Sequence, residues 1–250
     1  VDRIFVGHGV GAIGIAATTV ALPIMTILMA IAMLIGVGAT SLISIRLGQK
    51  KPEEAEKVAG NAVVLLVVLP VLLTIIYLVF TDPILLFFGA SNEALPYARD
   101  FVHIVMLGSA FGAISMGVNN FIRAEGNPQL AMMTQIIGAL INIVLNYIFI
   151  FKLGLGIKGS ALATVSAQFV SALWVMSYYW SGRSIVKIRL KTMKLSLPIV
   201  FSIMAIGFAP FAMMLANCVQ QIILNKSLLF YGGDLALSAI GIIMSIAAMM

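Results

Sequence analysis

The sequence predicts an all-α, polytopic helical membrane protein, and three observations support this fold class. Hydrophobic residues make up 62% of the 250 residues and charged residues only 10%, whereas a soluble domain usually carries about 25% charged residues. The mean hydropathy is +1.12. Six stretches free of Asp, Glu, Lys and Arg each exceed the roughly 20 residues that cross a bilayer; they lie between residues 3 and 46, 57 and 82, 100 and 123, 125 and 152, 158 and 183, and 194 and 226.

In chain order, the apolar stretches predict helices at 13–47, 53–80, 93–121, 128–151 and 159–180, a sixth from residue 196, and a seventh apolar run after Asp234. Pro23 lies inside the first of these and should bend it, because proline removes a helical hydrogen bond. The chain starts at Val1 without a secretory leader pattern, and its last apolar run stops at Met250. We therefore expect a fragment of a longer polytopic protein.

The net charge of +6 reflects membrane topology, so we expect no nucleic-acid partner. Counted over alternate loops, one side of the membrane carries ten basic residues and the other carries five. This asymmetry follows the positive-inside rule and places the loops near residues 50, 125 and 188 in the cytoplasm. The ten basic residues are Arg46, Lys50, Lys51, Lys57, Arg123, Arg183, Lys187, Arg189, Lys191 and Lys194.

Uncharged polar side chains recur on four of the predicted membrane helices. Asn142 and Asn146 are four residues apart and so share one helix face. Such residues can be hydrogen-bond links between helices, worth about 0.6 kcal/mol each, or they can line a shared polar cavity. Because four helices carry them, we favour a cavity; the other members are Gln135, the group Ser115, Asn119 and Asn120, the stripe Ser160, Thr164, Gln168 and Ser171, and the pair Asn217 and Gln221.

Signals of enzymatic chemistry do not appear in the sequence. His8 and His103 stand alone, without further ligands at metal-binding spacing. Nucleophile, phosphate-loop and paired-carboxylate motifs are also missing from the predicted spans. We therefore predict no enzyme, no cofactor and no metal site beyond a possible sodium ion.

Several segments together carry a family resemblance. VDRIFVGHGVGAIGIAA, NNFIRAEGNPQLAM, LNIVLNYIFIFKLGLGIKGSALATVSAQ and LNKSLLFYGGDLALSAIGI resemble the MATE family of multidrug and toxic compound extrusion antiporters, in its MepA-like bacterial branch. The resemblance implies a MOP-type fold of twelve helices in two six-helix lobes. On this basis 1–182 spans the end of helix 1 through helix 6, 183–195 is a basic cytoplasmic linker, and 196–250 holds helix 7 and the start of helix 8.

The resemblance also implies which residues couple transport to an ion. Asp2 matches the family's helix-1 acid, Asn142 its helix-5 asparagine and Thr164 its helix-6 threonine. Asn146 departs from the pattern, because many relatives have an aspartate there. An amide can bind a cation through its oxygen but does not carry a proton. The substrate cavity is expected to include Asn119, Asn120, Gln168, Asn217 and Gln221.

These considerations predict a multidrug exporter of a bacterial cytoplasmic membrane, in contact with lipid and monomeric. It would exchange amphipathic organic cations against Na⁺ or H⁺ by alternating access. Two alternatives remain. A flippase for lipid-linked oligosaccharides is disfavoured because its phosphate ligands call for Lys or Arg inside the spans. A non-transporting receptor or scaffold would not need polar faces on four helices.

Overall fold

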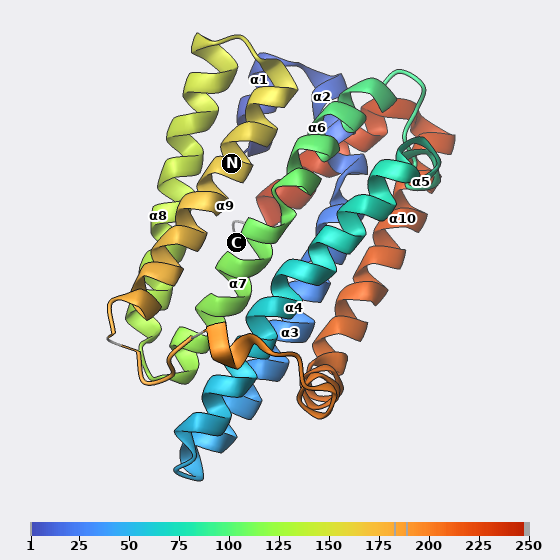
Figure 1. Ribbon diagram of the computed structural model, residues 1–250. Helices are drawn as coiled ribbons and strands as arrows, with labels where there is room; N and C mark the ends of the chain where they lie inside the picture. Colours follow the sequence, from blue (N-terminus) through green and yellow to red (C-terminus); the bar gives the residue numbers. More distant parts are fainter. Residues whose placement is uncertain (1, 183, 189, 248–250) are drawn as a thin grey trace.

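The computed structural model describes residues 2–182, 184–188 and 190–247, and within them every regular element is a helix (Figure 1). The elements are α1 (Asp2–Gly9), α2 (Ala12–Val20), α3 (Leu22–Gly48), α4 (Pro52–Val79), α5 (Thr81–Phe87), α6 (Leu95–Leu107), α7 (Ser109–Ala124), α8 (Pro128–Asn146), the π-helical turn η1 (Tyr147–Lys152), α9 (Gly156–Trp180), the 3₁₀ turn η2 (Leu190–Met193) and α10 (Leu197–Ala247).

Long apolar helices make up most of the molecule. Five are long and apolar enough to cross a membrane, and the bent pair α6 and α7 would be a sixth. The five are Ala12–Gly48, which joins α2 and α3, then Pro52–Val79, Pro128–Lys152, Gly156–Trp180 and Leu197–Met244. The predicted class, an all-helical polytopic membrane protein, is confirmed.

The sequence predicts one continuous helix over 93–121, and this prediction is wrong. The structure divides the segment into α6 and α7, which meet at an angle of 54° at Gly108. A Cβ atom at Gly108 would lie 2.5 Å from the side chain of Val165, so α9 approaches the backbone closely at the bend. The Met106 carbonyl oxygen at this break lies 2.8 Å from Thr74 Oγ1. A neighbouring hydroxyl therefore satisfies a carbonyl that the bend leaves exposed.

Two other helices are also interrupted. The bend predicted near Pro23 is present as a break at Ala21 between α2 and α3, with proline in the first turn of α3. The helix predicted over 128–151 keeps α-helical geometry only to Asn146, and η1 completes it as a π-helical turn. At Gly11, where φ is 87°, α1 is separated from α2.

The last helix, α10, runs along α3 and then breaks at Gly233, which has φ 60° and ψ −159°. Glycines allow the close crossing with α3: a Cβ atom at Gly207 would overlap the Leu34 carbonyl oxygen, and one at Gly38 would overlap that of Ile203. The break immediately precedes Asp234, where the sequence predicts a new apolar run. The division of the chain at 182 and 195 stays a prediction.

Glu125, at the end of α7, holds the start of the basic segment 183–195. Its carboxylate accepts hydrogen bonds from Ser184 Oγ at 2.6 Å and from the Val186 backbone N–H at 3.2 Å. Arg183 and Arg189 lie outside the described residues. The described part of this segment is thereby fastened to the end of the bundle where α7 turns into α8 (Figure 1).

Candidate functional site

Three helices bring polar side chains together around the carboxylate of Asp2 on α1. Asn146 on α8 donates a hydrogen bond from Nδ2 to Asp2 Oδ1 at 2.8 Å. Thr164 Oγ1 on α9 lies 3.3 Å from Asp2 Oδ2 and 3.0 Å from the Ser160 carbonyl oxygen. Asp2 and Thr164 are half-buried and Asn146 is fully buried. The result is a carboxylate with neutral polar partners from two other helices.

The amide of Asn146 is only half satisfied. Its Nδ2 also lies 2.9 Å from the Asn142 carbonyl oxygen and 3.2 Å from Asn142 Oδ1, the contact that four-residue helical spacing favours. Its Oδ1 is buried and has no hydrogen-bond partner among the described residues. A buried carbonyl without a partner costs about 1–3 kcal/mol. A bound cation would supply the missing partner.

The available ligand atoms around Asp2 are oxygens. The carboxylate and the side-chain oxygens of Asn142, Asn146 and Thr164 are hard ligands of the kind that alkali and alkaline-earth cations prefer. Among the residues that the structure describes, no group of three or more His, Cys, Asp or Glu could hold a metal ion. The donor set therefore fits a hard monovalent cation better than a transition metal.

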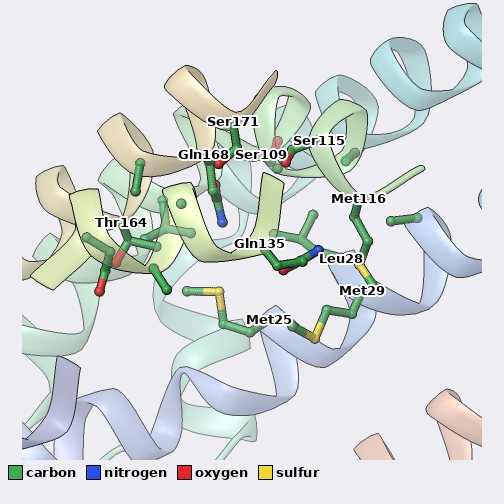
Figure 2. A pocket seen from close by; sticks show the side chains of 18 of the residues that line it. Met25, Leu28, Met29, Ser109, Ser115, Met116, Gln135, Thr164, Gln168 and Ser171 are labelled. Atoms are coloured by element: carbon green, nitrogen blue, oxygen red, sulfur yellow. The ribbon is translucent and has the colours of Figure 1, made fainter. Parts of the chain in front are cut away.

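A cavity of about 460 Å³ adjoins this cluster, and Asp2, Asn142 and Thr164 are part of its lining. One wall is apolar and comes mainly from α3 and α7, with Met25, Leu28, Met29 and Met116. In Figure 2 these side chains face a polar wall that carries Gln168 and Ser171 from α9 and Ser109 and Ser115 from α7. The size and the mixture of surfaces match a small-molecule site.

Much of the polar wall has no protein partner. Ser115, Gln135, Gln168 and Ser171 make no side-chain hydrogen bond within the described parts of the chain. Links between helices would show such bonds, as Ser109 does with Thr74 at 3.0 Å. A polar side chain inside an apolar bundle lowers stability unless it has a hydrogen-bond partner. These four side chains are therefore available to a ligand or to water.

Comparison with known proteins identifies the family. The model of the family described as MatE matches residues 1–148. The chain belongs to the MatE family. It is 31% identical over 228 residues to the multidrug export protein MepA of Staphylococcus haemolyticus, a match that covers 91% of this chain and 50% of that protein.

Solved structures of MATE transporters share the fold. The MATE multidrug transporter DinF-BH superimposes with a TM-score of 0.92 and 35% identity, over 97% of this chain and 54% of that one. An inward-facing MATE transporter of the MOP superfamily gives a TM-score of 0.91 and 29% identity, over 96% and 55%. The chain spans about half the length of the relatives it matches.

The four residues expected at the ion-coupling site, Asp2, Asn142, Asn146 and Thr164, lie together, but the expected cavity residues do not. Gln168 lines the cavity. Asn119 on α7 is 1% exposed, and Asn120 faces Gly36 of α3; neither lines the cavity. Asn217 is exposed on α10, and Gln221 lies 3.1 Å from Thr26 Oγ1. A role for these four in substrate binding stays a prediction.

Several cavity residues were not chosen from the sequence. Gln135, Ser115 and Ser171 belong to the polar faces recognised there, but the sequence alone did not show which members face inward. Met25, Met29 and Met116 are indistinguishable in sequence from methionines that face lipid. The Gln168 amide packs against Gly112, and this contact is visible only once the helices are assembled.

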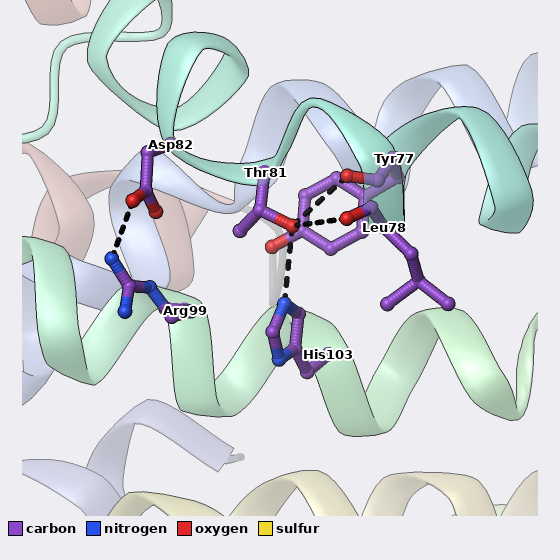
Figure 3. A network of polar contacts seen from close by, with 6 residues as sticks. All are labelled: Tyr77, Leu78, Thr81, Asp82, Arg99 and His103. Carbon is purple, nitrogen blue, oxygen red and sulfur yellow. Dashed lines mark hydrogen bonds and ion pairs between the residues drawn. The ribbon is translucent and has the colours of Figure 1, made fainter.

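A second polar cluster lies on α4, α5 and α6, away from the cavity (Figure 3). His103, which has no metal-ligand neighbours in the sequence, forms a hydrogen bond with Thr81, with Nε2 and Oγ1 3.1 Å apart. Its ring packs edge-on against that of Tyr77. Beside it, Arg99 donates to Asp82 Oδ2 at 2.6 Å. These contacts tie the short helix α5 to α6, so we interpret the cluster as a brace of the MatE fold.

Proposed function

We propose that this chain is part of an exporter that moves amphipathic organic cations out of the cell in exchange for a sodium ion. The observation that carries the proposal is the position of Asp2. Its carboxylate lies between the oxygen cluster of Asn142, Asn146 and Thr164 and the cavity of about 460 Å³. One acidic group thus faces both a small-ion site and a site large enough for a drug.

The residue at position 146 supports sodium over a proton as the coupling ion. The amide of Asn146 does not carry a proton, but its buried oxygen can bind a cation. Asp2 then supplies the charge, and neutral oxygens from three other side chains complete the coordination. A proton would use only the carboxylate and would leave the Asn146 oxygen without a partner.

Because the two sites share Asp2, sodium and a cationic substrate compete for one negative charge. Asp2 is the sole acidic residue among the described residues that line the cavity. Loading by either cation neutralises it, and loading by both leaves an extra positive charge at low dielectric. Mutual exclusion of this kind is what exchange transport requires.

The composition of the cavity wall supports a cationic substrate and disfavours a lipid-linked phosphate. Within the described residues, no Lys or Arg lines the cavity. The apolar wall with its flexible methionines suits aromatic ligands of varied shape. Unpaired polar side chains on the opposite wall would be unnecessary in a receptor or scaffold that binds nothing there.

The proposed orientation places the basic loops in the cytoplasm. The turn from α3 to α4, the turn from α7 to α8 and the segment after α9 lie at one end of the bundle (Figure 1). Glu125 and Ser184, and Glu56 and the Lys187 backbone, are in contact there, which supports a shared side for these loops. The membrane would then be a bacterial cytoplasmic membrane.

Transport in proteoliposomes with separate gradients tests the function. The full-length protein is reconstituted, and ethidium efflux is followed with a sodium gradient at equal pH, and then with a proton gradient without sodium. We expect the sodium gradient to drive efflux, and Asp2→Asn to abolish it. Efflux driven only by the proton gradient would reject sodium coupling, and no efflux under either gradient would reject the export function.

A further inference from the structure

The short helix α1 contacts two different parts of the molecule through consecutive residues. Asp2 faces α8 and α9, as described above. The next residue, Arg3, donates a hydrogen bond from Nη1 to the carbonyl oxygen of Gly241 on α10. Neighbouring side chains on an α-helix leave the axis about 100° apart, since a turn holds about 3.6 residues. One helix can therefore contact both partners at once.

The part of α10 that Arg3 contacts lies beyond the break at Gly233 and packs closely on α2. A Cβ atom at Gly241 would overlap Thr19 Oγ1, so there is no room for a side chain between the two helices. In Figure 1 this final part of α10, drawn in red, begins at the end of the bundle that holds α1 and α2 and runs back across the bundle beside α2. The break at Gly233 makes it a helical segment distinct from 197–232.

Two further contacts, each with a neutral hydroxyl donor, fasten the same segment. Ser91 Oγ donates to Asp234 Oδ2 at 2.8 Å, and Ser238 Oγ donates to the Ala12 carbonyl oxygen at 2.7 Å. Neither involves Asp2 or its partners. The contact from Arg3 differs because its donor is charged and lies next to the acid of the ion site.

The charge on Asp2 affects the Arg3 contact directly. A half-buried guanidinium is stable beside a carbonyl when a nearby carboxylate balances its charge. When a cation neutralises Asp2, Arg3 faces a second positive charge in a poorly screened region, and exposure to water becomes more favourable. Neutralising Asp2 should therefore weaken the contact with Gly241.

We propose that Arg3 is a positioning residue that holds residues 234–247 against α1 and α2 while Asp2 is charged, and that releases them when a cation fills the site. This inference rests on the proposed function, because it names the signal by which loading becomes movement. An empty transporter stays fastened at this end, whereas one loaded with sodium or with drug is free to change conformation. We call the contact between Arg3 and Gly241 the latch. It prevents the conformational change when neither sodium nor drug is bound.

Hydrogen exchange measures how firmly the latch holds the end of α10. Deuterium uptake of peptides from 234–244 is followed by mass spectrometry on the full-length protein in nanodiscs, with sodium or with N-methyl-D-glucamine at equal ionic strength. In the wild type we expect sodium to accelerate exchange on the order of tenfold, the effect of losing one charge-assisted hydrogen bond. Arg3→Gln should exchange fast without sodium and show no sodium response, whereas Arg3→Lys should retain the response.

Ser91→Ala is the matched control. It removes a contact of the same segment that has a neutral donor and involves neither Arg3 nor Asp2, so exchange should rise while the response to sodium persists. Equal exchange in Arg3→Gln and wild type without sodium, or a sodium response retained by Arg3→Gln, would overturn the inference, whether or not the wild type exports ethidium. Arg3-dependent exchange in a protein that exports nothing would instead reject only the proposed function.

Discussion

Replacing Asn146 with leucine would remove both contributions that this side chain makes to the Asp2 site while keeping a similar volume. The amide donates to Asp2 Oδ1 at 2.8 Å, and its buried Oδ1 is without a partner in the described structure. In the leucine variant the carboxylate loses its shortest hydrogen bond, and a sodium ion loses one oxygen ligand. Because the residue is fully buried, water cannot easily replace either.

The distances set the expected size of this effect. Loss of the Asn146 oxygen as a ligand of the sodium ion should cost about as much as loss of a polar contact to a charged group, about 1.5–3 kcal/mol, which corresponds to about 10–150-fold in affinity. Thr164→Val removes a weaker contact, because Oγ1 lies 3.3 Å from Asp2 but 3.0 Å from the Ser160 carbonyl oxygen. For Thr164→Val we expect a loss of about threefold or less.

The assay is the sodium concentration that gives half-maximal ethidium efflux from proteoliposomes at constant pH. Thermal unfolding of each purified variant establishes that the fold is retained. The half-saturating sodium concentration should rise strongly for Asn146→Leu and slightly for Thr164→Val. An unchanged value for Asn146→Leu, or a larger rise for Thr164→Val, would refute the assignment of Asn146 to the cation site.

Three further substitutions test packing, the cavity and the linker. Gly207→Ala places a Cβ atom on top of a backbone oxygen of α3 and should lower stability by about 3 kcal/mol or more in thermal unfolding, whereas Gly48→Ala, with open space around it, should not. Gln168→Leu should reduce the efflux of ethidium, which carries amino groups, about fivefold. The efflux of tetraphenylphosphonium, which has no amino group, should stay unchanged. Glu125→Gln weakens the acceptor of the hydrogen bonds from segment 184–188, so trypsin should cleave there faster.

The sequence predicts the positions of the long helices well, because each one follows from a charge-free stretch that is long enough to cross a bilayer. It does not predict where such a stretch bends or breaks into two helices. The 54° bend at Gly108 depends on the approach of Val165 from a helix that lies much later in the chain, and on a hydroxyl from α4. Likewise, the π-helical turn after Asn146 carries no composition that separates it from the α-helix before it. Both features arise from tertiary packing.

The same distinction applies to the site. Spacing of four residues places Asn142 and Asn146 on one helix face, and the family resemblance adds Asp2 and Thr164 to the same site. Orientation within the bundle is a different matter: Asn119 has the same chemistry as Asn142, yet it is buried away from the cavity. A polar residue in a membrane helix thus shows that a partner is needed, and the assembled helices determine which partner it is.

A final prediction follows from the charge of the cavity. With Asp2 as the one acidic residue among the described lining residues, a monovalent cation restores neutrality and a divalent one leaves a charge of +1. An uncompensated charge in such a site is unfavourable at low dielectric. Ethidium and propidium share the same aromatic ring system but carry one and two positive charges, so they form a matched pair.

We expect the wild type to export ethidium at least about tenfold more efficiently than propidium, which corresponds to about 1.4 kcal/mol. Asn146→Asp places a second carboxylate where the amide now lies, 2.8 Å from Asp2, and should narrow the difference. Measuring initial efflux rates of both dyes for both proteins decides the matter. Equal export of the two dyes by the wild type would mean that Asp2 does not set the charge of the substrate, and that acids elsewhere in the full-length transporter compensate the second charge.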